Sequence, residues 1–156
     1  MKYKQYPFLI TAVLVLTMAF LTGCGPFIQK IAGGGIELES LKEKNPEVVS
    51  TFRTANENGK KVLVIFDAAW CGYCRKFNQI TMKDREVRKT LTDFEVVNID
   101  VDRSPEAMKV FQKASGGQKI GGVPTLMIFN SNGTHKARVT AYYKPPKFND
   151  FLKKNS

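Results

Sequence analysis

The chain has 156 residues, enough for one domain with a buried core but hardly for two. A hydrophobic content of 43% and a charged content of 24% are typical of a globular protein and exclude a disordered one. The formal charge is +10, but the basic residues are spread along the chain without an Arg-rich run or a nucleic-acid motif. We therefore expect a solvated, mildly basic surface and no nucleic-acid partner.

The N-terminus has the pattern of an export signal. Lys2 and Lys4 precede an apolar run, Phe8–Leu21, which is as long as a signal h-region and short for a membrane-spanning helix. The run ends at Leu21-Thr22-Gly23-Cys24, which resembles the bacterial lipobox. This resemblance implies that Cys24 becomes the first residue of the mature chain and carries lipids. The alternative is an incidental cysteine after an uncleaved anchor.

These features divide the chain into three parts. We expect a signal peptide over residues 1–23, a lipidated Cys24 with a flexible, glycine-rich tether over 24–40, and one domain over 41–156. The expected location is the bacterial cell envelope, with the protein lipid-anchored on the extracytoplasmic side of a membrane. Cys71 and Cys74 are the other two cysteines, so one dithiol pair and one modified cysteine account for all three.

Helices and strands alternate along the domain. Asn45-Pro46-Glu47 supplies an N-cap, a first-turn proline and an acidic residue, so a helix is expected from there to Asn58-Gly59. Val62–Phe66 is a continuous apolar run, as expected of a buried central strand. A helix from Cys71 to about Ile80 and a short helix between Lys83-Asp84 and Leu91 should follow.

The second half of the domain continues this alternation and ends in a hairpin. The expected elements are a strand over Phe94–Val101, a helix from Ser104-Pro105-Glu106 to Gly116-Gly117, a strand over Thr125–Phe129, a strand over Thr134–Ala141 and a helix after Pro145-Pro146. Asn132-Gly133 is a strong hairpin signal, so the last two strands should be antiparallel.

This order predicts an α/β fold. Strands that alternate with helices should pair in parallel, and the C-terminal hairpin adds an antiparallel edge, which gives a central mixed β-sheet flanked by helices. Such an element order is that of the thioredoxin fold. Five phenylalanines are expected in the core: Phe66, Phe94, Phe111, Phe129 and Phe151.

The segment Trp70-Cys71-Gly72-Tyr73-Cys74 follows the buried strand and opens a helix. Unpaired backbone N–H groups and the positive end of the helix dipole stabilise an anion there. A nucleophilic thiolate is therefore favoured at Cys71. Two intervening residues place Cys74 one helical turn further on, close enough to Cys71 for a disulfide.

Three motifs carry a resemblance to the thioredoxin family over about residues 41–154: Asp67-Ala68-Ala69-Trp70-Cys71-Gly72-Tyr73-Cys74, Gly122-Val123-Pro124-Thr125 and Asn132-Gly133. The resemblance implies that Pro124 is cis and packs beside the dithiol, and that the backbone of Val123 pairs with a bound substrate strand. Residues Thr81–Leu91 look like the periplasmic thioredoxin-like domains related to the C-terminal domain of the membrane disulfide reductase. The Gly72-Tyr73 dipeptide is similar to that of periplasmic disulfide isomerases.

The family resemblance implies a thiol–disulfide oxidoreductase that acts on exported proteins, needs no bound cofactor and works in the reductase or isomerase direction. Cys71 would attack a substrate disulfide and Cys74 would resolve the mixed disulfide. The expected partners are protein thiols and disulfides, a thiol electron donor or acceptor, and the membrane, with the chain itself a monomer. The catalytic candidates are Cys71, Cys74, Pro124 and Trp70, and the substrate-binding candidates are Gly72, Tyr73, Val123 and Thr125.

Two positions depart from the family pattern. Ile65 stands where thioredoxins usually have a buried Asp, and Val96 aligns with the buried Lys on the next strand. We expect these two apolar residues to form a core pair, which removes the family's proton relay. Asp67 is the nearest candidate to replace it, and a solvated strand-end carboxylate is the competing interpretation.

Three alternative functions stay open. One is a dedicated electron relay for a single client, such as a cytochrome c maturation factor. Another is a non-catalytic binding lipoprotein that uses the thioredoxin fold as a scaffold. The third is a zinc site, but structural zinc needs four ligands and the domain offers only His135 besides the two cysteines. His135 is therefore expected to be a surface residue without a role.

Overall fold

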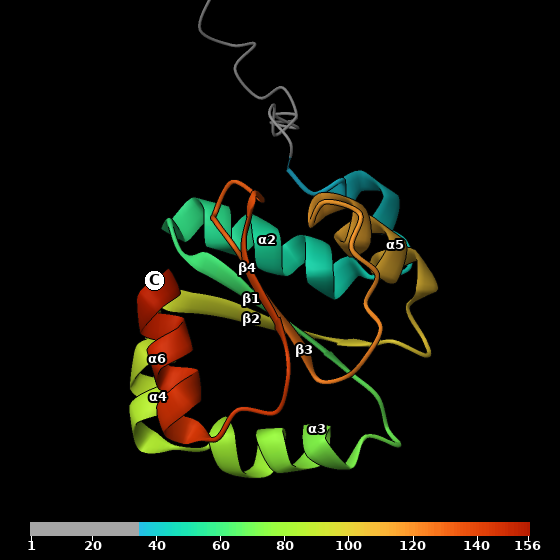
Figure 1. Ribbon diagram of the computed structural model, residues 1–156. Coiled ribbons are helices and arrows are strands. Elements are labelled where there is room, and N and C mark those ends of the chain that lie inside the picture. The colour runs from blue at the N-terminus through green and yellow to red at the C-terminus, as the bar shows by residue number, and fades with distance from the viewer. Residues whose placement is uncertain (1–34) are drawn as a thin grey trace, which may run out of the picture. The chain divides into compact units, whose positions relative to one another are not determined.

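The computed structural model describes residues 35–156. A four-stranded sheet with the strand order β2-β1-β3-β4 has helices on both faces (Figure 1). Its strands are β1 (Lys61–Asp67), β2 (Phe94–Asp100), β3 (Thr125–Phe129) and β4 (His135–Thr140). The helices are α2 (Pro46–Asn58), α3 (Gly72–Lys76), α4 (Arg85–Thr90), α5 (Pro105–Ala114) and α6 (Pro145–Asn155). Short 3-10 helices, η2 (Leu38–Leu41) and η4 (Leu91–Asp93), and a π-helical turn, η3 (Phe77–Thr81), complete the described chain.

The mixed sheet confirms the predicted fold class, with one difference in strand direction. β1 and β2 are parallel, and β3 and β4 form the expected antiparallel hairpin. β3 is also antiparallel to β1, although the alternation of helices and strands predicts a parallel pair. The physical reason is the loop between α5 and β3, residues 115–124. It returns the chain to the end of the sheet where β2 finishes, and β3 begins there.

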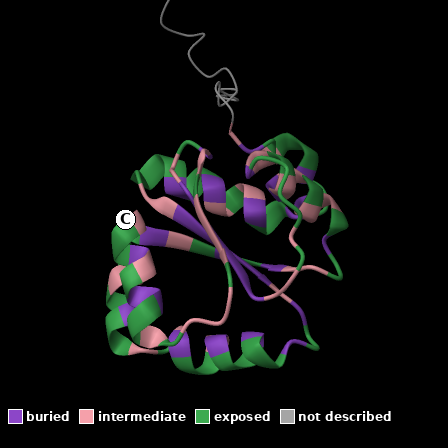
Figure 2. Cartoon of the chain, viewed as in Figure 1, coloured by how far each residue is buried: buried purple, intermediate pink, exposed green. Residues whose placement is uncertain are grey.

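The two faces of the sheet bury separate apolar clusters (Figure 2). Under α2 and α5, Phe111 contacts three other aromatic rings, with centroids 5.3 to 6.1 Å apart. Under η3, α4 and α6, Phe77 and Phe148 pack edge to face at 4.9 Å. Four of the five predicted core phenylalanines are buried: Phe66, Phe94, Phe111 and Phe129. The fifth, Phe151, is half-buried.

The ends of α2 show one expected cap and one unexpected contact. Gly59 ends the helix in the left-handed conformation at φ 67°, which a glycine adopts without steric cost. Asn45 precedes the helix, but its side chain does not cap it. Its Nδ2 instead donates to Ser104 Oγ at 3.1 Å, so a buried hydrogen bond joins the starts of α2 and α5.

The expected core pair between Ile65 and Val96 is wrong. Ile65 is buried, but its register partner on β2 is Asn98, and Val96 lies opposite Leu63. Val96 is 37% exposed because β2 is an edge strand, beside which residues 35–156 place no further strand.

The described chain begins at the end of the sheet where β1 starts. The Ile36 N–H donates to the carbonyl of Gly133 in the β3–β4 hairpin at 3.1 Å, and Lys113 pairs with Glu37 at 2.9 Å. Ile36 and Glu37, which the sequence assigns to the tether, therefore contact the domain. The predicted signal peptide and Cys24 lie outside the described residues. Within residues 35–156, none of the helices combines the length and hydrophobicity that crossing a bilayer requires.

Candidate active site

Cys71 and Cys74 form a disulfide where β1 leads into α3. Both cysteines are nearly inaccessible, with 4% and 3% of their surface exposed. Cys71 is the N-cap of α3, and its Sγ accepts a hydrogen bond from the Cys74 N–H at 3.0 Å. In the reduced protein the same donor would stabilise a thiolate at Cys71, as predicted from the helix start.

The Val123–Pro124 peptide bond is cis, as the family resemblance implies. It brings the Val123 carbonyl oxygen to 3.6 Å from Cys71 Sγ. Val123 also packs against the small apolar cluster of Ala68, Cys71 and Cys74. Two motifs whose contacting residues are 52 positions apart in the chain thus meet at one sulfur atom.

Two side chains of β4 hold the loop that leads to Val123. Arg138 donates from Nη1 to the Gln118 carbonyl at 2.9 Å and from Nη2 to the Lys119 carbonyl at 2.6 Å. Thr125 Oγ1 donates to the Gly122 carbonyl at 2.6 Å and, since its hydrogen is used there, accepts from Thr140 Oγ1 at 2.8 Å. Sequence reasoning identified Thr125 but missed Arg138 and Thr140, because polar residues on a half-exposed strand give no local signal.

The two aromatic residues of the motif lie on the surface beside the dithiol. Trp70 is 67% exposed, which excludes a core role, and its Nε1 donates to Asp102 Oδ2 at 2.9 Å. Tyr73 is 61% exposed and stacks on Tyr142 with ring centroids 5.8 Å apart. Sequence reasoning missed Asp102 and Tyr142. The two consecutive tyrosines, Tyr142 and Tyr143, shortly before a helix start were the sequence signal that could have identified Tyr142.

Asp67 is half-buried at the end of β1, not a fully solvated carboxylate. Burial raises the pKa of its carboxyl group, a hydrogen bond with Asn78 opposes this, and the neighbouring Asp100 carboxylate adds to the rise. A carboxyl group with a raised pKa can exchange protons closer to neutral pH than an ordinary aspartate. This environment suits the predicted relay, which stays a prediction.

His135 lies at the start of β4, opposite Phe129 in the register. Phe129 is the last residue of β3, whereas the cis-proline immediately precedes the first, so His135 and the dithiol are at opposite ends of the strand. The structure corrects the expectation of a surface histidine in part: the residue is half-buried, its Nε2 is buried, its ring packs on Phe129 at 5.3 Å, and burial lowers its pKa. Among residues 35–156, no three His, Cys, Asp or Glu side chains form a metal-binding group.

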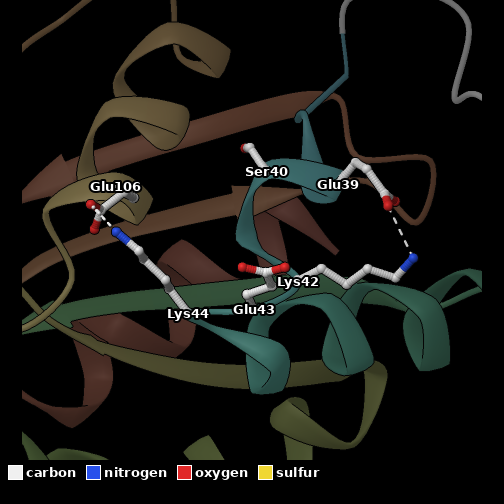
Figure 3. Close-up of a pocket in the computed structure, with 6 residues that line it drawn as sticks. All are labelled: Glu39, Ser40, Lys42, Glu43, Lys44 and Glu106. Atoms are coloured by element: carbon white, nitrogen blue, oxygen red, sulfur yellow. Dashed lines mark hydrogen bonds and ion pairs between the residues drawn. The ribbon is translucent and has the colours of Figure 1, made fainter.

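A surface hollow away from the dithiol lies over η2 and the start of α5 and contains neither cysteine (Figure 3). Its charged side chains pair with each other, since Lys42 contacts Glu39 at 3.0 Å and Lys44 contacts Glu106 at 2.7 Å. The hydrogen bond with Glu106 raises the pKa of Lys44 and lowers that of Glu106. The pairing satisfies most of these charges, so this hollow offers no chemistry comparable to that of the dithiol.

The chemistry of the site agrees with a comparison of the sequence with known families. Residues 48–156 match the family model described as a thioredoxin-like domain. The chain belongs to the thioredoxin-like family. Its disulfide-bonded CxxC pair and this membership make it a thioredoxin-like thiol–disulfide oxidoreductase.

Relatives of this thioredoxin-like chain are larger proteins. It is 30% identical over 147 residues to the thiol:disulfide interchange protein DsbD of Photorhabdus laumondii, a match that covers 89% of this chain and 25% of the relative. A match to DsbD of Actinobacillus pleuropneumoniae is 28% identical over 153 residues and also covers 25% of the relative. The chain thus spans about a quarter of the length of the curated relatives it matches.

Solved structures share the thioredoxin-like fold. A disulphide isomerase from Xylella fastidiosa superposes with a TM-score of 0.60 at 22% identity, covering 72% of this chain and 90% of that one. The oxidised C-terminal domain of Neisseria meningitidis DsbD gives 0.57 at 21% identity, covering 71% of this chain and 94% of that domain. At these identities the likeness shows the fold alone.

Proposed function

We propose that this oxidoreductase reduces or isomerises disulfides of exported proteins and needs no bound cofactor. The observation that carries the proposal is the approach of Cys71 Sγ to the Val123 carbonyl, 3.6 Å away. A client strand that pairs with the backbone of Val123 would present its disulfide to Cys71. Gly72 and Tyr73, which lie between the cysteines, would complete the binding surface, and the buried Thr125 would support it by holding the loop at Gly122.

The reaction proceeds by two exchanges. The Cys71 thiolate attacks one sulfur of the client disulfide, so that a mixed disulfide forms and one client thiolate leaves. Cys74, deprotonated through Asp67 or water, then attacks Cys71 Sγ in the mixed disulfide, and the second client thiolate leaves. The client gains two electrons, and the protein ends with the Cys71–Cys74 disulfide. In isomerisation the released client thiolate attacks the mixed disulfide instead, and Cys71 is returned as a thiolate.

Continued reduction requires a dithiol donor that returns two electrons to the pair. A second candidate function, a dedicated electron relay between such a donor and one client, is favoured by the similarity to thiol:disulfide interchange proteins that are about four times longer. A relay would exchange rapidly with one partner and reduce generic disulfides poorly. A cytochrome c maturation factor is one client of suitable chemistry.

Insulin reduction by the dithiothreitol-coupled assay tests the activity. We expect turnover by the wild-type chain and background rates for Cys71→Ser. Reduced Cys74→Ser, mixed with insulin after removal of the dithiothreitol, should give a trapped mixed disulfide, because the resolving thiol is then missing. A non-catalytic binding lipoprotein would show background rates in all three. That result would contradict the proposal, whereas slow insulin turnover with rapid exchange toward one protein would favour the relay.

We further propose that the protein is anchored to a membrane of the cell envelope through a lipidated Cys24. Residues 36 and 37 contact the domain at the end of the sheet opposite the dithiol, which supports an anchor attached away from the dithiol. Mass spectrometry of membrane-extracted protein tests this. An unmodified Cys24, or a chain that still carries residues 1–23, would contradict it.

A further inference from the structure

We propose that a strip of aromatic and basic side chains beside the dithiol binds acidic side chains of the client protein. This aromatic–basic strip consists of Tyr73, Lys76, Tyr142, Tyr143 and Lys147. The inference rests on the proposed function, since it concerns the protein substrate of the same dithiol. It adds the chemical class that the substrate presents next to its disulfide.

The strip consists of two groups of contacting side chains, which the chain joins between Tyr142 and Tyr143. Lys76 Nζ lies 5.8 Å from the centroid of the Tyr73 ring, and Tyr73 stacks on Tyr142 at 5.8 Å with an interplanar angle of 27°. Tyr143 follows in the chain and carries Lys147 Nζ over its ring at 4.6 Å. Both lysines lie within cation–π range of their rings. The strip therefore starts between the two cysteines and extends to the first turns of α6.

The contacts under the strip hold it in place. Thr81 Oγ1 in η3 donates to the Tyr143 carbonyl at 2.8 Å, which fastens the loop between β4 and α6 to the helix that follows the dithiol. The Tyr143 ring also packs on Phe151 at 6.1 Å. A surface that is held before the client arrives loses less conformational entropy on binding.

The charges of the strip are available to a partner. Within residues 35–156, neither Lys76 nor Lys147 forms a salt bridge, whereas Lys42 and Lys44 are paired with glutamates. An ammonium group on a ring keeps N–H donors that point to solvent, and carboxylates are the protein groups that complement them. Arg75 adds a third cation, which hydrogen-bonds to the Ala69 carbonyl and to no carboxylate of the described chain.

The other flank of the dithiol has the opposite character. β2 and β4 are the two edge strands, and the loops that follow them reach the dithiol from opposite sides. The loop after β2 contributes Asp102, whose carboxylate accepts from the neutral Trp70 indole, while Arg103 pairs with Asp100. A client with an acidic residue toward Tyr142 is therefore attracted, and one with its acidic residue toward Asp102 is repelled.

Three disulfide-bridged peptides that differ only in two flanking residues, Glu, Gln or Lys, provide the test. With the reduced full chain at low salt, we expect kcat/KM for the Glu peptide to exceed that for the Lys peptide by about tenfold, a gap that high salt narrows. The double variant Lys76→Gln, Lys147→Gln should reduce the gap to about twofold. The control Lys136→Gln, Lys153→Gln changes the net charge equally at exposed sites away from the strip and should keep the gap.

Equal kcat/KM values for the Glu and Lys peptides would overturn the proposal. It would also be overturned if the control variant narrowed the difference in kcat/KM as much as Lys76→Gln, Lys147→Gln does. Failure to reduce even the Gln peptide would contradict the proposed function instead. Binding to phosphatidylglycerol vesicles tests whether the strip contacts an anionic lipid surface instead of a client protein. If they bind the wild-type chain but not the strip variant, and the peptide gap is absent, the strip contacts lipid and the proposal is wrong.

Discussion

The aromatic cluster under α2 and α5 and the surroundings of the dithiol are held together by different interactions. In the cluster, Phe52, Phe66, Phe111 and Phe129 are fully buried, and the Phe111 ring contacts the other three, so the contacts are between apolar groups. Around the dithiol, hydrogen bonds between distant segments fix side chains that are partly exposed. The difference indicates that the cluster determines stability while the hydrogen bonds determine the geometry of exchange.

Replacing the central ring of the cluster should have the largest effect. Phe111 contacts three aromatic neighbours, so Phe111→Ala leaves a cavity and should lower the free energy of unfolding by about 3–5 kcal/mol. Urea denaturation measures this loss, with the half-buried Phe151→Ala as a control that should lose less. A loss of unfolding free energy below about 1 kcal/mol would contradict the conclusion that the cluster determines stability. A changed reduction potential in the folded variant would contradict the conclusion that the cluster does not affect the dithiol.

Releasing the loop before the cis-proline should act on substrate binding. Arg138→Ala removes two hydrogen bonds to the Gln118 and Lys119 carbonyls, so Val123 is held less firmly and KM for a disulfide peptide should rise about fivefold at nearly unchanged kcat. Arg138→Lys should rescue little, because an ammonium lacks the planar fork. Steady-state kinetics give both constants. An unchanged KM with a lowered kcat would show that Arg138 acts on the chemical step instead.

The half-buried carboxyl group of Asp67 should affect activity and stability in opposite directions. If it relays the proton of Cys74, Asp67→Asn lowers the reductase rate and removes the acidic limb of its pH profile. Rates measured from pH 5 to 8 decide this. An unchanged rate and profile would exclude the relay, and the carboxylate would then be a strand-end residue without a role in exchange.

The stability effect of the same substitution is the smallest that we predict. Because the folded state raises the pKa of Asp67, its contribution to stability is greatest below the ordinary Asp pKa of about 3.9 and is lost as the pH rises through the raised value. The neutral Asp67→Asn variant escapes this loss and should melt at a higher temperature than wild type at pH 7, but not at pH 3. A lower Tm at pH 7 would show that the carboxylate makes net favourable contacts.

The parts of the fold that sequence could predict are those with a local pattern. The apolar runs of β1 and β3 are continuous because both of their faces are buried, and Asn132-Gly133 marks the hairpin between β3 and β4. The Cys71–Cys74 spacing and the cis-proline motif located the reactive end of the sheet. Local patterns sufficed here because each feature depends on residues close together in the chain.

The remaining features depend on contacts between distant segments. The direction of β3 is set by the path of residues 115–124, which carry no periodic signal. The exposure of Val96 follows from the edge position of β2, and Asn45 bonds a residue 59 positions away. Arg138 and Asp102 are charged residues whose partners lie 19 to 32 positions away in the chain, so no motif could assign them.

The reduction potential of the Cys71–Cys74 pair in the full chain tests the central claim most directly. Equilibration with a dithiol redox buffer, followed by thiol trapping, measures the ratio of the two states. We predict a value near that of thioredoxin, about −270 mV, because the proposed direction is reduction. A value near −120 mV, that of a strong oxidant, would make the protein a disulfide donor and contradict the account.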